Sequence, residues 1–175
     1  MFYSNILRFI VKNNIFIIKC LNPAEINNNY IKELNKNKFV RYNIRKKISI
    51  SEQINYIENI NKSANNIIFG LFNKKVLIGT IGLQKISKKK YYIGIFVFDQ
   101  IFKNIGLAKF MIKKVGKFMN KKLNIKFLFA SVNKKNFISH KLFHSLNFKI
   151  HKKIKKRYKS DVVYFTNINK IKVKI

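Results

Sequence analysis

The stretch Ile93–Lys109, IGIFVFDQIFKNIGLAK, has the residue types of an anion-binding corner. An apolar run of β-branched and aromatic residues ends at Asp99-Gln100, and a short polar loop leads to Gly106 at the start of an amphipathic segment. A strand that passes into a helix in this way leaves backbone N–H groups without partners at the helix N-terminus, where the helix dipole also favours negative charge. The pattern predicts a site for a phosphate-bearing cofactor.

A second segment with functional residue types begins at Asn136. Ser139 lies on the same face of the predicted helix, and His140 and His144 form an i,i+4 pair. Asn136 suits both an N-cap and a ligand contact. Two histidines at this spacing could bind a metal, but no cysteine, acid or further histidine lies nearby in the sequence, so we expect no metal.

The carboxylates do not identify a general base. Glu52 closes a predicted capping box with Ser49, and Asp99 is expected to end a strand in a turn. Glu33 and Glu58 lie on the two predicted N-terminal helices and remain candidates, although a base that acts through water would suffice. The full set of acids is Glu25, Glu33, Glu52, Glu58, Asp99 and Asp161.

Hydrophobic periodicity predicts the elements that position these residues, in the order ββααβββαβαββ. The expected strands are Leu7–Val11, Ile15–Cys20, Asn65–Asn73, Val76–Ile86, Tyr91–Phe98, Ile125–Ser131, Phe148–His151 and Val162–Asn167. The expected helices run from Pro23 through Leu34, from Ser49 through Ile60, from Gly106 through Lys121 and from Asn136 through Ser145. The third helix has an apolar stripe of Leu107, Phe110, Met111, Val115, Phe118 and Met119, with lysines opposite. No repeat or Pro/Gly-rich linker interrupts the 175 residues, so we expect one domain, 1–175.

Composition places the chain among globular proteins. Hydrophobic residues make up 47%, and no apolar run approaches the ~20 residues that span a bilayer. The N-terminus alternates apolar and polar residues, which favours strands over a signal peptide. Cys20 is the single cysteine, so an internal disulfide is excluded and a cytoplasmic location fits.

The charge balance is extreme, with 38 Lys+Arg against 6 Asp+Glu and a net charge of +32. Such a charge can indicate a polyanionic partner, or a coding bias that enriches lysine, asparagine, isoleucine and phenylalanine together. Only four of the 38 are arginines, the better bidentate phosphate readers, which favours the bias and argues against a specific nucleic-acid site.

Two motifs together resemble the GNAT acyltransferase superfamily. Lys103-Asn104-Ile105-Gly106-Leu107-Ala108 is similar to that family's Gln/Arg-x-x-Gly-x-Gly/Ala loop, and Val132–Phe148 is similar to the V-x-x-x-N-x-x-S…l-y-x-x-l-G-F segment of its RimJ/RimL-like branch. The hairpin segment Ile78–Leu83 and the helical N-terminal half are also similar to that branch. The resemblance implies a single-domain α/β GNAT fold with a mixed, mostly antiparallel central sheet flanked by helices.

The resemblance also implies an N-acetyltransferase that uses acetyl-CoA as donor. The pyrophosphate would be bound by the backbone of the loop and first helical turn, with a lysine beside it. The residues are Lys103, Asn104, Gly106, Leu107, Ala108 and Lys109. The strand end, Phe96, Val97 and Phe98, would hold the pantetheine, and a backbone N–H there would stabilise the tetrahedral oxyanion. Asn136, Ser139 and Phe143 complete the predicted cofactor contacts.

The sequence departs from the family at two positions. Phe143 stands where many members have a tyrosine that protonates the departing CoA thiolate, and phenylalanine has no proton to give. Tyr158, Tyr164 and His144 are the candidates to replace it. Asn147 stands where the family has glycine, a swap that a left-handed backbone tolerates.

The acceptor is less defined than the donor. The segments YIKELN and SEQINYI resemble the members that act on amino sugars of surface polysaccharide pathways, and the basic loops at 41–47 and 152–159 suit a nucleotide-linked or other acidic acceptor. Alternatives are an acetyltransferase of protein N-termini, including those of ribosomal proteins, and a catalytically weak GNAT-like protein that binds RNA or ribosomes. We expect a monomer or a homodimer without a membrane span.

Overall fold

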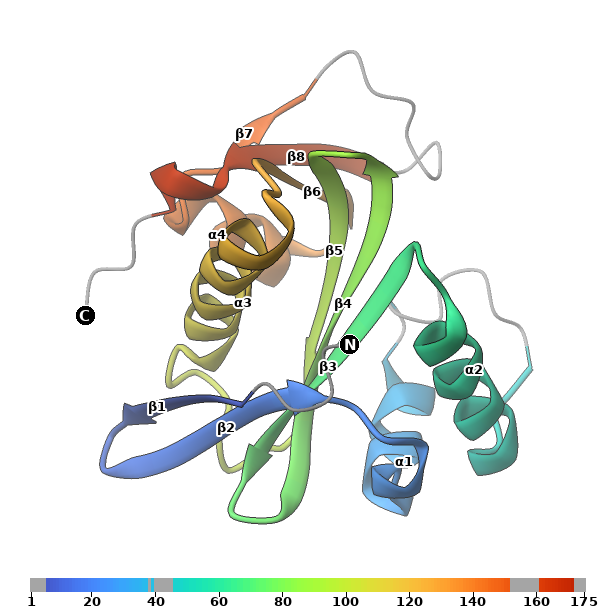
Figure 1. Cartoon of the computed structure of the whole chain (residues 1–175). Coiled ribbons are helices and arrows are strands. Elements are labelled where there is room, and N and C mark those ends of the chain that lie inside the picture. Colours follow the sequence, from blue (N-terminus) through green and yellow to red (C-terminus); the bar gives the residue numbers. More distant parts are fainter. Residues whose placement is uncertain (1–5, 38, 40–45, 152–160, 172–175) are drawn as a thin grey trace. The chain divides into compact units, whose positions relative to one another are not determined.

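The computed structural model describes residues 6–37, 39, 46–151 and 161–171 (Figure 1). The chain divides into two compact units, Met1–Gly82 with Ile95–Leu107, and Leu83–Gly94 with Ala108–Ile175. The predicted order of strands and helices is confirmed throughout the described residues. The strands are β1 (Leu7–Val11), β2 (Asn14–Cys20), β3 (Asn66–Asn73), β4 (Val76–Ser87), β5 (Lys90–Val97), β6 (Phe127–Asn133), β7 (Lys149–Ile150) and β8 (Asp161–Asn167). The helices are α1 (Asn28–Lys36), α2 (Ile50–Lys62), α3 (Leu107–Leu123) and α4 (Phe137–Ser145), with 3₁₀ turns at Pro23–Glu25 and Ile168–Lys170.

The described strands form one eight-stranded sheet in the order β1-β2-β3-β4-β5-β6-β8-β7. The pairs β1–β2, β2–β3, β6–β8 and β7–β8 are antiparallel, and β5–β6 is parallel. A parallel neighbour requires a crossover, and α3 supplies it. The mixed, mostly antiparallel α/β sheet predicted from the sequence is therefore confirmed.

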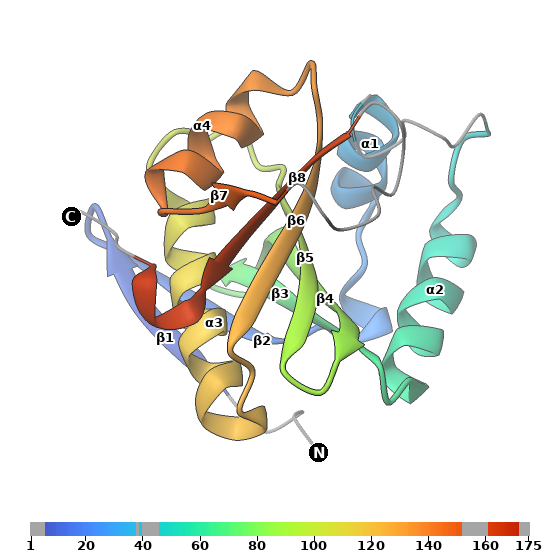
Figure 2. The same ribbon diagram turned by 90° about the horizontal axis from the view of Figure 1, so that it is seen from above.

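In the first unit, α1 and α2 lie next to each other and α2 packs along β3 (Figures 1 and 2). Their inward residues, among them Tyr30, Leu34 and Ile57, share a core with Leu77 of β4 and with Phe98 just after β5. These side chains are at most 7% exposed. Burial of a side chain of this size stabilises the fold by about 1.5–3 kcal/mol.

The first helix begins later than predicted. Pro23–Glu25 forms a 3₁₀ turn, after which Ile26 is extended and Asn27 caps α1 by accepting from the N–H of Tyr30. Two asparagine caps within five residues, at Asn22 and Asn27, divide a segment whose apolar spacing alone suggested one helix. By contrast, the predicted capping box of Ser49 and Glu52 is confirmed in both hydrogen bonds, and it starts α2.

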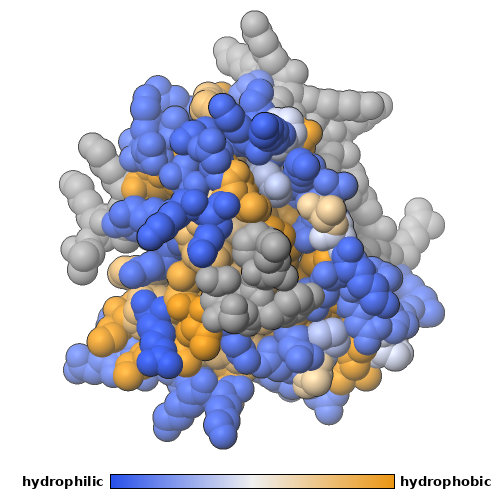
Figure 3. Space-filling view, in the orientation of Figure 1, coloured by the Kyte–Doolittle hydropathy of each residue, from blue (hydrophilic) through white to orange (hydrophobic). Residues whose placement is uncertain are grey.

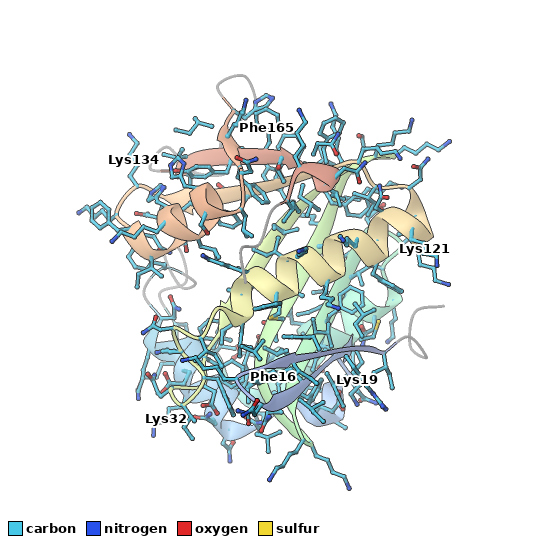
Figure 4. The ribbon with its side chains drawn as sticks, turned by 90° about the vertical axis from the view of Figure 1, so that its left-hand side faces the viewer. Phe16, Lys19, Lys32, Lys121, Lys134 and Phe165 are labelled. Atoms are coloured by element: carbon cyan, nitrogen blue, oxygen red, sulfur yellow. The ribbon has the colours of Figure 1, made fainter. Side chains whose placement is uncertain are left out.

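In the second unit, α3 buries most of the predicted stripe. Leu107, which ends the first unit, Met111, Val115 and Met119 are at most 2% exposed, while Phe110 and Phe118 are half-buried. A Cβ at Gly116 would lie 3.4 Å from the side chain of Leu128 on β6, which shows how closely α3 approaches that strand. Lysines occupy the outer side, and Figure 4 shows Lys121 of α3 and Lys134 after β6 pointing away from the unit.

The second half of this unit differs in detail from the prediction. Ile138 shares helical spacing with Leu142 and Leu146 but is 82% exposed, and Phe143 is the buried residue of α4. Asn147 follows the helix with φ 67°, the left-handed backbone expected at the family's glycine position. Phe148–His151 is only a two-residue strand, β7, that pairs with β8.

The face seen in Figure 3 is mainly hydrophilic where it is coloured, with scattered apolar side chains. The largest apolar patch in that view lies over the β1–β2 hairpin, where Ile10 and Ile15 pair across the strands and are 67% and 58% exposed. None of the helices in the described ranges combines the length and apolar character needed to cross a bilayer.

Candidate functional site

The first residues of β5 pair in parallel with β6, from Lys90↔Phe127 to Tyr92↔Phe129. On its other side β5 stays close to β4, where a Cβ at Gly79 would lie 3.0 Å from the carbonyl oxygen of Phe96.

One N–H group of the predicted oxyanion segment Phe96–Phe98 already has an acceptor within the protein. The N–H groups of Phe98 and Asp99 both donate to the carbonyl of Ile78 on β4, at 3.1 and 3.4 Å. Phe98 is also buried in the core of the first unit. The N–H of Phe98 is therefore already used within the protein, and the predicted oxyanion contact at this strand end stays a prediction.

The loop that follows has a defined backbone. Asp99 accepts from the N–H of Ile101 at 2.9 Å, which confirms its predicted place in a turn. The Phe102 ring packs edge-on against Phe16 of β2, with centroids 5.3 Å apart, and so holds the loop to the hairpin (Figure 4 labels Phe16). Asn104 and Gly106 then have positive φ values of 63° and 86°.

This corner has peptide N–H groups that lie before the first hydrogen-bonded turn of α3. Leu107 begins α3, so the N–H groups of Leu107, Ala108 and Lys109 have no acceptor within the helix. Left-handed residues immediately before a helix turn successive N–H groups toward the same concave side, and the helix dipole adds partial positive charge. The exposed Lys103 contributes a full positive charge beside them. The corner predicted from the sequence thus has the backbone that phosphate binding requires.

The structure separates the two candidate bases. Glu33 on α1 accepts from Gln100 Nε2 at 3.3 Å, so it lies at the loop that follows β5. It also forms an ion pair with Lys36 at 3.1 Å. The hydrogen bond from Lys36 lowers the pKa of Glu33 below its usual value, and the charge of Lys36, the hydrogen bond from Gln100 and the charge of Lys103 act in the same direction. Glu58 is exposed on α2. Glu33 is consequently the better placed of the two but a weak base.

Sequence reasoning missed a buried polar group near the same strand end. The hydroxyl of Tyr30 accepts from Gln53 Nε2 at 3.1 Å, and its ring lies 5.2 Å from that of Phe98 and 6.3 Å from that of Phe96. Burial raises the pKa of Tyr30 to about 12. The signal was available, since Gln53 lies four residues before the buried Ile57 and hence on the inward face of α2.

In the second unit, Asn136 is the N-cap of α4. Its side chain accepts from the N–H of Ser139 at 3.1 Å, and its own N–H donates to the carbonyl of Asn133 at 2.8 Å. The cap half of the predicted dual role is confirmed. The cofactor contact of Asn136 stays a prediction.

The same helix brings together candidates that are distant in the sequence. Phe143 stacks on Tyr164 of β8, with centroids 5.9 Å apart, and the Tyr164 hydroxyl lies 3.2 Å from His144 Nε2. His140 bonds to the same hydroxyl at 2.7 Å. Tyr158, the other candidate proton donor, lies outside the described residues. Within residues 6–37, 39, 46–151 and 161–171, no three His, Cys, Asp or Glu side chains are grouped as a metal site would need.

Comparison with known proteins agrees with these features. A family model described as an acetyltransferase (GNAT) domain matches residues 20–149. No curated protein matches the chain. Among solved structures, Campylobacter jejuni N-acetyltransferase PseH is 22% identical with a TM-score of 0.62, covering 86% of this chain and 97% of its own.

Two further structures show the same fold at lower identity. The ribosomal L7/L12 alpha-N-protein acetyltransferase RimL is 11% identical with a TM-score of 0.73, covering 93% of this chain and 94% of its own. Mycobacterium smegmatis RimJ is 9% identical with a TM-score of 0.74, covering 93% and 86%. PseH has also been solved in complex with acetyl coenzyme A, and RimJ with a CoA-disulfide.

Proposed function

The chain belongs to the GNAT acetyltransferase family, and we propose that it lies in the RimJ/RimL-like branch and that its acceptor is an amino sugar, free or linked to a nucleotide, of a surface polysaccharide pathway. Acetyl-CoA is the acetyl donor. The proposal concerns the residues that bind the donor and the chemical class of the acceptor.

For the donor, we assign the pyrophosphate to the backbone of Asn104–Lys109 with Lys103 beside it, and the pantetheine to the end of β5 at Phe96–Val97. The positive φ values of Asn104 and Gly106 support the pyrophosphate assignment. Asn136 and Ser139 would contact the pantetheine, and Phe143 would pack against it.

The distribution of carboxylates is the observation that carries the choice of acceptor. Asp161 is the only side-chain carboxylate in the second unit, and it is 4% exposed and accepts from Ser131 Oγ. In the first unit, lysines pair with the carboxylates of Glu25, Glu33 and Glu52. A surface of this kind repels a polyamine or a basic protein tail and attracts an acceptor that carries phosphate.

Sequence similarity supports the same choice. Identity to PseH is 22%, against 11% for RimL and 9% for RimJ, although these two have the higher TM-scores. The segments YIKELN and SEQINYI, which resemble the amino-sugar group, form parts of α1 and α2. These helices flank the strand end where the acetyl group would lie in this proposal. We propose that the protein acts in the cytoplasm, as a monomer or a homodimer.

The acceptor is tested by measuring CoA release with a matched panel of amines. The panel contains a nucleotide-linked amino sugar, the same sugar without the nucleotide, a peptide with the N-terminus of a ribosomal protein, and spermidine. We expect the nucleotide-linked sugar to have a kcat/KM about tenfold or more above those of the peptide and spermidine, and this advantage to shrink as salt is added. A peptide acceptor with the highest kcat/KM would refute the proposal in favour of N-terminal acetylation.

The non-catalytic alternative makes a different prediction. A protein that binds RNA or ribosomes without turnover would bind acetyl-CoA weakly or release no CoA with any amine. Calorimetry with acetyl-CoA at low and physiological salt separates the two. RNA affinity that disappears at physiological salt identifies the basic surface as nonspecific.

A further inference from the structure

Three ring side chains form a hydrogen-bonded chain in the second unit. His140 and His144 lie one turn apart on α4, and Tyr164 lies on β8, which is paired with β6. His140 Nδ1 is 2.7 Å from the Tyr164 hydroxyl, and the same hydroxyl is 3.2 Å from His144 Nε2. The remaining nitrogen of His140, Nε2, is 3.1 Å from the carbonyl oxygen of Asn133 at the end of β6.

The carbonyl sets the direction of the whole chain. A carbonyl oxygen only accepts, so His140 Nε2 carries a proton and donates it to Asn133. In the neutral imidazole Nδ1 is then an acceptor, and the Tyr164 hydroxyl donates to it. The Tyr164 oxygen in turn accepts from His144 Nε2–H. Each group therefore has one arrangement of its proton, and the chain runs from His144 through Tyr164 to His140.

The location of this chain connects it to acetyl transfer. His140 follows Asn136 by four residues and its N–H donates to the Asn136 carbonyl at 3.1 Å, so both lie on the same face of α4. Phe143, where related enzymes have a proton-donating tyrosine, stacks on the Tyr164 ring at an interplanar angle of 21°. Tyr164 is 2% exposed, whereas His144 is exposed. A buried hydroxyl beside Phe143 is thus linked to solvent through one imidazole.

We propose that Tyr164 replaces the missing tyrosine of position 143 as the proton donor to the departing thiolate, with His140 and His144 as positioning residues. The inference rests on the proposed contacts of acetyl-CoA with Asn136 and Phe143. It does not depend on which amine is the acceptor.

The proposed step balances in protons and electrons. As the carbon–sulfur bond of the tetrahedral adduct breaks, its electron pair goes to sulfur. The Tyr164 hydroxyl turns its proton away from His140 Nδ1 and gives it to that sulfur. His144 then passes its Nε2 proton to the Tyr164 oxygen and takes a proton from water at Nδ1. Burial raises the pKa of Tyr164, so the hydroxyl is protonated at neutral pH before the step and releases its proton only as charge develops on the sulfur.

The decisive variant is Tyr164→Phe, which removes one oxygen and keeps the ring. We expect kcat to fall about 100-fold, the usual size of a general-acid contribution, while the Kd for acetyl-CoA measured by calorimetry stays near wild type. Tyr92→Phe, which removes a hydroxyl from β5, is the matched control and should keep full activity. Wild-type kcat in Tyr164→Phe would overturn the proposal.

A second variant tests the replacement directly. In the double variant Tyr164→Phe/Phe143→Tyr, the hydroxyl returns at the position where related enzymes have it. We expect a kcat at least tenfold above that of Tyr164→Phe alone. A hydroxyl with a purely structural role in the Tyr164 network would not be restored from position 143, so an absence of rescue would refute the role.

A readout without turnover tests the positioning residues. Long-range proton–nitrogen NMR of the histidine rings should show His140 and His144 as Nε2–H tautomers in the wild type, and His144 should lose this preference in Tyr164→Phe. A wild-type Nδ1–H tautomer at His140 would overturn the chain. If acetyl-CoA binds and is used but Tyr164→Phe is fully active, only the relay fails. If wild-type protein does not bind acetyl-CoA, the proposed function fails.

Discussion

Gln100 donates a hydrogen bond of 3.3 Å from Nε2 to Glu33 Oε2, which joins the loop after β5 to a helix 67 residues earlier in the chain. This contact places a carboxylate of α1 at the strand end that we assign to the thioester. The ion pair with Lys36 keeps Glu33 ionised, so it can attract an ammonium group but removes a proton from it poorly.

We therefore expect Glu33→Gln to lower kcat/KM by no more than about tenfold, mainly through KM for the amine, because an ionic contact at a solvent-accessible site contributes little. Glu58→Gln, on the exposed side of α2, serves as the control and should change neither constant. Steady-state kinetics with the best amine of the panel measure both. Complete loss of activity in Glu33→Gln would identify it as the essential base instead.

Gly106→Asp should be far more harmful than either glutamate variant. Gly106 has φ 86°, a backbone that side chains rarely adopt, and a carboxylate there would repel phosphate at the start of α3. We expect the Kd for acetyl-CoA to rise about 100-fold or more. Gly106→Ala isolates the backbone effect, which costs roughly 1 kcal/mol of stability. Intact acetyl-CoA binding in Gly106→Asp would exclude this loop as the pyrophosphate site.

Asn136 has a confirmed cap and a predicted cofactor contact, and substitution separates them. Asn136→Asp retains the cap, because aspartate accepts from the N–H of Ser139 as asparagine does, but it removes the amide donor. We expect an unchanged melting temperature and about tenfold weaker acetyl-CoA binding. Asn136→Ala should lose about 1 kcal/mol of stability as well. Equal acetyl-CoA affinity in wild type and Asn136→Asp would exclude the cofactor contact and show that Asn136 acts only as the N-cap of α4.

Cys20 should react slowly with thiol reagents. Burial raises the pKa of Cys20 from 9.0 to about 11, so at pH 8 the thiolate fraction falls about 100-fold below that of an exposed thiol. Alkylation by iodoacetamide at pH 8 should be slower by this factor, accelerate as the pH rises toward 11, and return to the ordinary rate in urea. Fast alkylation of the folded protein would contradict the burial of β2.

Tyr30 predicts a loss of stability in alkali. Its pKa is 10.0 in the reference state and about 12 in the fold, so the folded protein holds the phenolic proton more tightly. The stabilisation is complete below pH 10 and decreases by about 1.4 kcal/mol per unit as the pH rises from 10 toward 12. Tyr30→Phe should lower the free energy of unfolding by about 1 kcal/mol near pH 8, because the hydrogen bond with Gln53 is lost. It should also make the free energy of unfolding less dependent on pH between pH 10 and pH 12. Urea titrations across this pH range measure both, and identical slopes would refute the assignment.

The sequence by itself determined the order of the elements and the position of the corner that we assign to the donor. Alternating and 3.6-residue periodicities, the capping box of Ser49 and Glu52, and the asparagines that cap or follow helices are local signals, because the atoms that they join lie within a few residues. For the same reason Gly106 and the start of α3 could be located before the fold was known. The division of the segment after Pro23 into a 3₁₀ turn and α1 was missed because two competing caps outweigh its apolar spacing.

Only the tertiary structure decided which distant side chains meet. The Gln100–Glu33 contact, the burial of Gln53 against Tyr30, and the use of the Phe98 N–H by Ile78 each join residues from separate elements. The pairing of β8 with β6 brings Tyr164 to the two histidines of α4, which the sequence had suggested only as a possible metal pair. Strand register and helix packing create these contacts, and no spacing along the chain specifies them.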